Sequence, residues 1–225
     1  MLWSLDSLLG FALHEQDGDL GKVHDFYFDD DTWTVRYLVV ETGRWFQRKR
    51  VLVAASIVTQ SGWEHRKFCV PLTKEQVLRS PKIDTDAPVS RQHEIEMQSY
   101  YGWPAYWTME PYVLTPPPQA VTSTIDRTAQ GDPHLRSFRE LTTYRAWTTD
   151  GFAGFVEDFF VDDANWEIRC LRVALGEWWP HKMVGLERKQ VSEISWREKL
   201  VRFSLNRKQI EEAPPPVSAA RPASK

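Results

Sequence analysis

Acidic and imidazole side chains are the groups in this sequence whose type and spacing could do chemistry. Asp29, Asp30 and Asp31 form a run of carboxylates that could bind a hard cation. No glycine follows at the loop position that a calcium-binding hand requires, and no glutamate occupies the last position of such a loop. Aspartates also hydrogen-bond their own backbone two positions on, so the run is predicted to shape a hairpin turn.

Other catalytic patterns are missing from the sequence. The 6 histidines are scattered, and none has the His-x-x-x-His spacing of a zinc site. There is no Gly-x-Ser-x-Gly turn for a nucleophile and no glycine-rich loop before a helix to bind phosphate. Cys69 and Cys170 form no C-x-x-C motif and are predicted to be reduced thiols in or near the core. We therefore expect no catalytic residue, no metal and no cofactor.

The segments that carry these residues occur twice. Shifted by 133 positions, Asp17 falls on Asp150, and the register then continues without a gap for roughly sixty residues. Further matched pairs are Asp25 with Asp158, Trp33 with Trp166, Arg36 with Arg169, Trp45 with Trp178 and Trp63 with Trp196. A repeat this long indicates two copies of one small domain, each near the size at which a single core is marginally stable. The copies are therefore expected to pack against each other or against another chain.

Each copy has the pattern of short strands and tight turns. Asp17-Gly18 and Asp150-Gly151 are hairpin signals, because glycine supplies the positive φ that a two-residue turn needs. The longest strand, 33–40, is apolar on both of its sides, which predicts that both faces are covered. Thr73 with Gln76, and Asn206 with Gln209, have capping-box spacing and predict a short closing helix in each copy. These features predict an all-β protein with two tandem small barrels.

The domain boundaries follow from changes in composition. The first barrel is predicted at 1–80 and the second at 135–211. A linker at 81–134 holds one predicted helix, at about 90–101, followed by a proline-rich segment. The tail 212–225 has the same proline-rich character and is expected to be disordered.

Charge and hydropathy restrict the function classes. The formal net charge is -3, which argues against nucleic acid as a partner. No stretch approaches the roughly 20 apolar residues of a membrane-spanning helix, and the start has no basic signal region. We expect a cytoplasmic protein without a membrane span, for which peripheral association with a membrane complex stays open.

The Asp-Gly-x-x-Gly-x-Val-x-Asp-Phe run at 17–26, the acidic turn, the strand 33–40 and the closing Leu-Thr-Lys-Glu-Gln at 72–76 resemble the PRC-barrel family. The family is named for the cytoplasmic domain of the H subunit of the purple bacterial photosynthetic reaction centre. A related barrel forms part of a ribosome maturation factor. The segment 83–104 is similar to the one that follows the first barrel in bacterial two-barrel members. The resemblance implies a small PRC-type barrel used as a docking module, generally without catalysis.

Two groups of residues are candidate interaction surfaces. The first consists of strand and linker residues with apolar or aromatic side chains: Val35, Tyr37, Val39, Trp45, Phe46, Trp103, Trp107, Trp178 and Trp179. The second is a basic cluster, Arg44, Arg48, Lys49 and Arg50, which with its neighbouring aromatics could stack on bases; a solvated strand face is its alternative.

We therefore predict a non-catalytic protein-binding or scaffolding module with an unknown protein partner, a second copy of the chain being one candidate. Two alternatives stay open. One is an accessory role in electron transport like that of the reaction-centre H subunit. The other is an RNA- or ribosome-associated factor.

Overall fold

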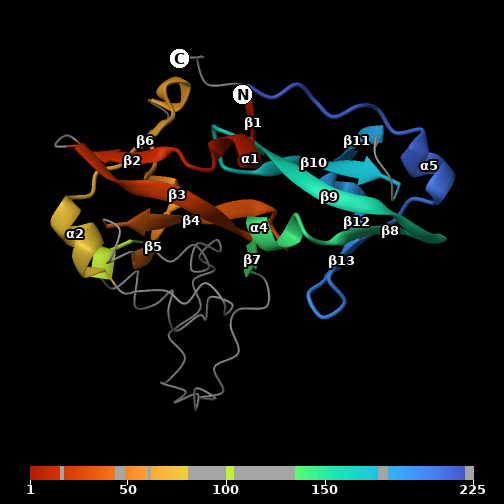
Figure 1. Cartoon of the computed structure of the whole chain (residues 1–225), viewed down its shortest axis with the longest axis horizontal. Helices are drawn as coiled ribbons and strands as arrows, with labels where there is room; N and C mark the ends of the chain where they lie inside the picture. The colour runs from red at the N-terminus through yellow and green to blue at the C-terminus, as the bar shows by residue number, and fades with distance from the viewer. Residues whose placement is uncertain are drawn as a thin grey trace, which may run out of the picture.

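The computed structural model describes residues 1–15, 18–43, 49–59, 62–80, 100–103, 135–176 and 182–220. The chain is built mainly of strands, which form two sheets with a few short helices beside them (Figure 1). The all-β prediction is confirmed. No helix within these ranges is long and apolar enough to cross a membrane.

The first sheet has the strand order β5-β4-β3-β2-β6. Its strands are β2 (Ala12–Glu15), β3 (Gly18–Asp29), β4 (Thr34–Thr42), β5 (Lys49–Ala54) and β6 (Lys67–Cys69). Short helical segments accompany them: α1 (Leu5–Leu8), η1 (Ala55–Ile57), η2 (Trp63–His65) and α2 (Lys74–Arg79). The predicted strand at 33–40 is therefore β4, one residue later at its start and two longer at its end.

The second sheet repeats this plan with the order β11-β10-β9-β8-β13-β12. Its strands are β8 (Arg145–Thr148), β9 (Gly151–Asp162), β10 (Ile168–Leu175), β11 (Lys182–Glu187), β12 (Val191–Ser195) and β13 (Leu200–Phe203). The helical segments are α4 (Phe138–Leu141), η4 (Arg188–Gln190) and α5 (Arg207–Glu211). Strand pairing closes neither sheet into a ring in the described part of the chain, so the two barrels are open sheets in this respect.

The two copies exchange their first strands. β1 (Leu2–Ser4) pairs with β9 of the second copy, whereas β7 (Leu135–Ser137) pairs with β3 of the first copy. Figure 1 shows β1 beside β9, and β7 below the first sheet. The predicted boundaries 1–80 and 135–211 therefore describe the sequence repeat but not the sheets. Each sheet is completed by the other copy, as expected for domains too small to bury enough apolar surface alone.

A buried aspartate holds each exchanged strand at its end. Asp158 is fully buried and accepts hydrogen bonds from the Ser4 hydroxyl (2.5 Å) and the Asp6 amide (3.1 Å) of the first copy. Asp25 accepts the equivalent bonds from the Ser137 hydroxyl (2.6 Å) and the Arg139 amide (3.0 Å). Each serine also caps the short helix that follows it. The repeated Asp thus links one copy to the other, a role that the sequence repeat alone did not indicate.

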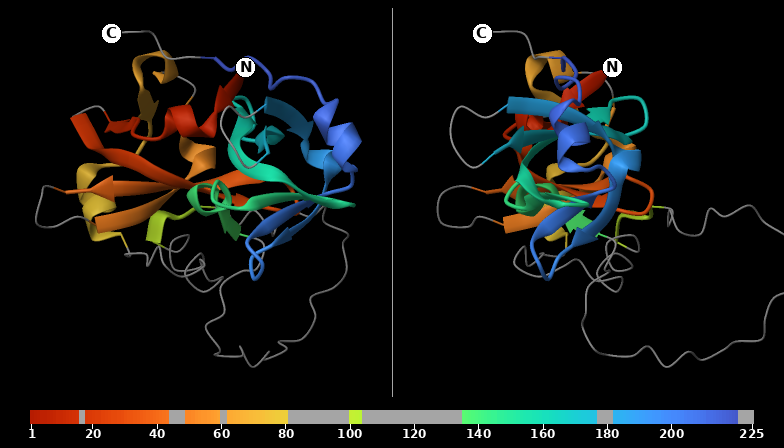
Figure 2. Two further views of the ribbon diagram at one scale, coloured as in Figure 1. Left: turned by 45° about the vertical axis from the view of Figure 1, so that its right-hand side comes forward. Right: turned by 90° about the vertical axis from the view of Figure 1, so that its right-hand side faces the viewer.

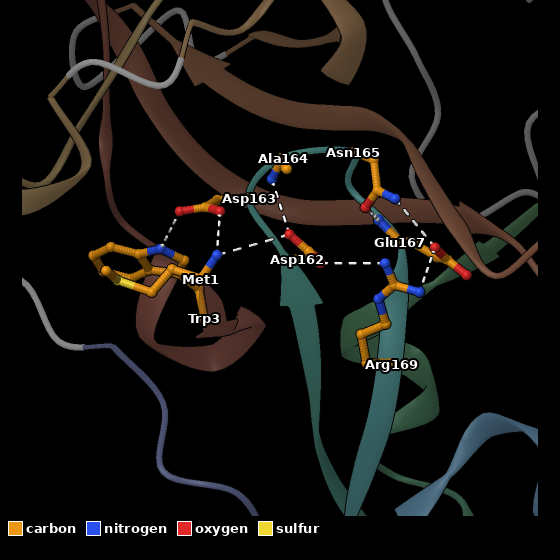
Figure 3. Close-up of polar contacts among 8 residues, drawn as sticks. All are labelled: Met1, Trp3, Asp162, Asp163, Ala164, Asn165, Glu167 and Arg169. Atoms are coloured by element: carbon orange, nitrogen blue, oxygen red, sulfur yellow. Dashed lines mark hydrogen bonds and ion pairs between the residues drawn. The ribbon is translucent and has the colours of Figure 1, made fainter.

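The acidic turns form a second set of contacts between the copies. The Val35 amide donates to the Trp166 carbonyl (2.9 Å), and the Ile168 amide donates to the Trp33 carbonyl (2.7 Å). Asp30 forms a 2.6 Å ion pair with Arg136 of the other copy. The equivalent aspartate, Asp163, accepts from the Trp3 indole (3.2 Å), and Figure 3 shows it between Trp3 and the amino group of Met1.

Aspartates of these turns also bond their own backbone, as predicted. Asp29 Oδ1 accepts from the amides of Asp31 (3.0 Å) and Thr32 (2.9 Å), and Asp162 Oδ1 accepts from Ala164 (3.1 Å). On its other side, Asp162 meets the Arg169 guanidinium at 3.2 Å (Figure 3). Turn formation and ion pairing thus account for the carboxylates of Asp29, Asp30, Asp162 and Asp163.

One hydrophobic core runs through both copies. Trp63 packs against Trp166 with ring centroids 5.0 Å apart, and Phe28 packs against Phe159 at 5.5 Å. The two copies lie side by side along the long axis of the molecule, with their β2–β3 and β8–β9 ends pointing in opposite directions (Figures 1 and 2). The chain is therefore organised like a symmetric dimer whose two subunits have been joined into one polypeptide.

The ends of the copies are also alike. Both predicted capping boxes are present, with Thr73 accepting from Gln76 and Asn206 from Gln209.

The segment 212–220, part of the tail expected to be disordered, instead follows the second sheet as an extended chain (Figure 1). The Pro214 carbonyl accepts from the Gly185 amide (2.8 Å), and the Ala220 amide donates to the Leu2 carbonyl (2.7 Å). Backbone hydrogen bonds to β11 and β1 hold this segment against the strands, although its composition is typical of disorder.

We expect the two interlocking aspartates to make stability depend on pH. Burial raises the pKa of both Asp25 and Asp158 above the ordinary value of 3.8, although hydrogen bonds from serine and from backbone amides oppose the shift. A raised pKa in the folded state means that protonation favours folding. This contribution is present below the unfolded pKa and is lost as the pH rises through the folded pKa.

The measurement is the free energy of unfolding in urea, from pH 4 upward to neutral, for the wild type and for a D25N/D158N variant. The wild type should lose stability relative to the variant as the pH rises, because asparagine cannot ionise. A wild type that gains stability relative to the variant would mean that the hydrogen bonds to the carboxylates outweigh the cost of burying charge.

Candidate functional site

The strand predicted as the contact surface is buried by the chain itself. Val35, Tyr37 and Val39 are each at most 2 % exposed. Val35 belongs to the main core, whereas Tyr37 and Val39 lie in a second apolar cluster on the opposite face of the first sheet. Both faces of the strand are thus covered, as predicted. The three side chains are not an exposed docking surface, which corrects that part of the prediction.

Aromatic residues of the linker cover this second apolar cluster. Tyr101 and Trp103 both pack against it, and their rings stack with centroids 4.2 Å apart and an interplanar angle of 8°. Trp103 therefore packs within the chain, against apolar side chains of β3, β4 and β5. The other predicted surface residues lie outside the described residues: Trp45, Phe46, Trp107, Trp178 and Trp179. The predicted linker helix also lies outside them, except for Tyr100 and Tyr101, which are helical.

Half of the predicted basic cluster can be placed, since Arg44 and Arg48 lie outside the described residues. The Lys49 ammonium donates to the Ser80 carbonyl at the end of α2. Arg50 lies 3.9 Å from a carboxylate oxygen of Glu41 on the neighbouring strand. Both cations are thus engaged with the chain itself, as in the alternative interpretation of the cluster as a solvated strand face.

The described residues contain no group of three or more His, Cys, Asp or Glu side chains placed to hold a metal ion. Both cysteines are free thiols. Burial raises the pKa of the Cys170 thiol to about 11, so that it is protonated at neutral pH and a poor nucleophile.

A group of partly exposed aromatic side chains lies on the second copy. Trp147 on β8 and Phe152 and Phe155 on β9 form a row with ring centroids 6.2 Å and 5.4 Å apart. Phe155 is 37 % exposed, and the other two are half-buried. Arg145 stands opposite Phe155 in the strand pairing and is exposed beside it. We call these four residues the aromatic patch.

The same positions in the first copy are polar. Trp147, Phe152 and Phe155 correspond, at the repeat distance, to His14, Asp19 and Lys22. His14 Nδ1 and Asp19 Oδ1 interact at 2.8 Å, so this pair replaces an aromatic contact by a polar one. The first copy shows that this fold accepts polar side chains at these three positions.

Sequence reasoning missed this patch because it followed the aromatics that recur in both copies. Recurring aromatics are mostly core here: Trp33, Trp166 and Trp63 are at most 9 % exposed. Trp196, the equivalent of Trp63, is the exception at 52 %. The informative signal was a group of three neighbouring positions that are aromatic in one copy and polar in the other.

The composition of the patch suits protein recognition. Tryptophan and arginine are the residues most enriched at energetic hot spots, and aromatic side chains give a large contact area at low entropic cost. Single exposed apolar residues are ordinary, whereas three neighbouring aromatics that are all partly accessible on one sheet face offer a partner a continuous apolar surface.

Residues 6–91 match the family model of the PRC-barrel domain, which places the domain in the first copy. The second copy is related to it by the internal repeat. No curated protein matches the chain.

Proposed function

From the premise that this chain carries a PRC-barrel domain and repeats it, we propose that it is a non-catalytic protein-binding module. The aromatic patch on the second copy would be its docking surface. The first copy would serve chiefly to complete the fold, since it supplies β1 to the second sheet. A tandem chain of this kind presents one recognition face, whereas a symmetric dimer of identical domains would present two. We expect it to act in the cytoplasm.

The observation that carries this proposal is the difference between the copies. Their strand orders, acidic turns and interlocking aspartates are equivalent, yet three neighbouring surface positions are aromatic in one copy and polar in the other. Exposed aromatics lower solubility, so a row of them in a single copy is best explained by a partner that covers it.

The patch also favours a protein over RNA as the partner. Arg145 is its one cation, and the formal net charge of the chain is -3, which gives no general attraction to phosphate. A matching surface would present apolar side chains to the three aromatics and a carboxylate to Arg145. A subunit of a membrane complex, such as one in electron transport, or a second copy of the chain could meet this description.

The test replaces the patch by the residues of the first copy, in a W147H/F152D/F155K variant of the full chain. The same fold carries these residues at the equivalent positions, so the variant should keep its circular dichroism spectrum and its melting temperature. Tagged wild type and variant are used to capture partners from an extract of the native host, with quantitative mass spectrometry. Light scattering after size exclusion tests self-association.

We expect at least one protein, or a second copy of the chain, to be bound by the wild type and reduced tenfold or more by the variant, because aromatic hot-spot residues each contribute on the order of 2 kcal/mol. The matched control is H14A/D19A/K22A on the first copy, which should keep the partner. Equal capture of every partner by the wild type and the patch variant would contradict the proposal.

A further inference from the structure

A cavity lies between α5 and the ends of β9, β10 and β11, with a volume of about 330 Å³. Figure 1 shows α5 beside these strands at one end of the molecule. Ala153, Leu175 and Ile210 line the cavity and are buried, at 9 % exposure or less. This volume is at the lower end of the range for ligand sites, which occur preferentially in such places as barrel mouths.

Charged side chains line the same cavity and are exposed, which puts them at its mouth. They are Lys182, Arg207 and Glu211. The Lys182 ammonium donates to the backbone carbonyl of Glu211, and the Arg207 Nε atom lies 3.7 Å from the Glu211 carboxylate. Among the described residues that line the cavity, two cations and one carboxylate leave an excess of one positive charge. The cavity is therefore apolar inside and cationic at its entrance.

The internal repeat shows which residue makes room for the cavity. Ala153 corresponds to Leu20 of the first copy, which is buried in the core at 7 % exposure. The pair of cations is retained, because Lys182 and Arg207 correspond to Lys49 and Lys74. The second copy thus keeps the two cations, adds the Glu211 carboxylate in place of Leu78, and has a smaller side chain at position 153. Leu175 and Ile210 are larger than their equivalents, Thr42 and Val77, so the space opens specifically at Ala153.

We propose that this cavity is a binding site for a small amphipathic carboxylate, such as a short fatty acid. Its alkyl group lies against Ala153, Leu175 and Ile210, and its carboxylate meets Lys182 and Arg207. The site is independent of the aromatic patch and of the docking function proposed for it.

The probe is octanoate, titrated into the full-length protein by calorimetry and by two-dimensional NMR, with 1-octanol as the neutral analogue. We expect a dissociation constant on the order of 1 mM for octanoate, typical of a ligand of this size. Octanol should bind several-fold more weakly, since it has no charge to meet the two cations.

Four variants localise the site. A153L, which restores the residue of the first copy, should weaken octanoate binding tenfold or more while the protein stays folded. K182M and R207Q should each weaken octanoate two- to fivefold and leave octanol unchanged. F155K in the aromatic patch should change neither. The proposal is overturned if octanoate does not bind at millimolar concentration, if A153L binds as well as the wild type, or if F155K abolishes binding. Equal affinity for octanol and octanoate would overturn the choice of a carboxylate.

Discussion

Replacing Asp158 by alanine is expected to lower the free energy of unfolding by about 3 kcal/mol. The carboxylate is 0 % exposed and accepts from the Ser4 hydroxyl, the Asp6 amide and the Phe159 amide. Alanine leaves these donors without an acceptor in a place that water does not reach. Each buried donor without a partner costs roughly 1–3 kcal/mol, and the removal of a costly buried charge offsets part of the sum.

The same substitution at Asp25 should cost somewhat less, because Asp158 also has a 3.4 Å ion pair with the Arg172 guanidinium and the equivalent position in the first copy is Val39. The donors to Asp25 are the Ser137 hydroxyl and the amides of Arg139 and Phe26. Because each aspartate holds the exchanged strand of the other copy, either substitution should loosen both halves in one cooperative transition. Hydrogen exchange of the amides of β1 and β7 should become faster in both alanine variants.

The asparagine variants D25N and D158N are the matched controls. The amide oxygen can still accept from the two backbone amides, and the amide group can donate to the serine hydroxyl, so each should cost less than half as much as alanine. Urea unfolding of all four single variants at neutral pH provides the comparison. If alanine and asparagine variants are equally stable, the buried hydrogen bonds do not hold the copies together.

Local features of the fold were predictable from the sequence because they depend on neighbouring residues. The capping boxes and the strand at 33–40 each follow from side chains within a few positions. The glycines of the predicted hairpin turns, Gly18 and Gly151, have a positive φ as expected, but they are the first residues of β3 and β9 and pair with Glu15 and Thr148, so each turn lies one residue earlier than predicted. The strand exchange could not be predicted in this way. Leu2–Ser4 and Leu135–Ser137 fill equivalent positions of the repeat, so the same local sequence is compatible with pairing to its own sheet or to the other.

The environment of the repeated tryptophans also depends on contacts between the copies. Trp63 is buried because Trp3 packs on it at 5.4 Å and Trp166 at 5.0 Å. In the other copy, the position equivalent to Trp3 is Arg136, whose guanidinium pairs with Asp30. Trp196 therefore lacks the equivalent aromatic neighbour and is exposed. Neither its own residue type nor its immediate sequence distinguishes it from Trp63.

The aromatic patch and the cavity share one origin, which the comparison of the copies makes visible. Each departs from the twofold pattern at a few positions of β8 and β9: Trp147, Phe152 and Phe155 for the patch, and Ala153 for the cavity. The first copy shows which residues this fold accepts at each equivalent position. Departures that serve no contact between the copies, unlike Arg136 in place of Trp3, are the candidates for a functional role.

Gly154, which lies between the patch residues in β9, is expected to tolerate no side chain. Its φ is +152°, and a Cβ atom built there would lie 1.9 Å from the Ala174 carbonyl oxygen on the paired strand β10. Because that oxygen belongs to the backbone, the clash can be relieved only if the two strands move apart. We expect G154A to lose about 3 kcal/mol or more and to disrupt both the patch and the neighbouring cavity.

Two other glycines separate the causes of this loss. Gly151 has a φ of +138° and open space around the missing Cβ, so G151A should cost about 1 kcal/mol from the backbone conformation alone. Gly21 is the equivalent of Gly154, and a Cβ atom built on it would lie 2.5 Å from the Glu41 carbonyl oxygen. The stability lost in G21A should therefore fall between the losses in G151A and G154A. Thermal and urea unfolding of the three variants give the order. If G151A is as damaging as G154A, backbone strain rather than the close approach of β9 and β10 determines why glycine is needed there.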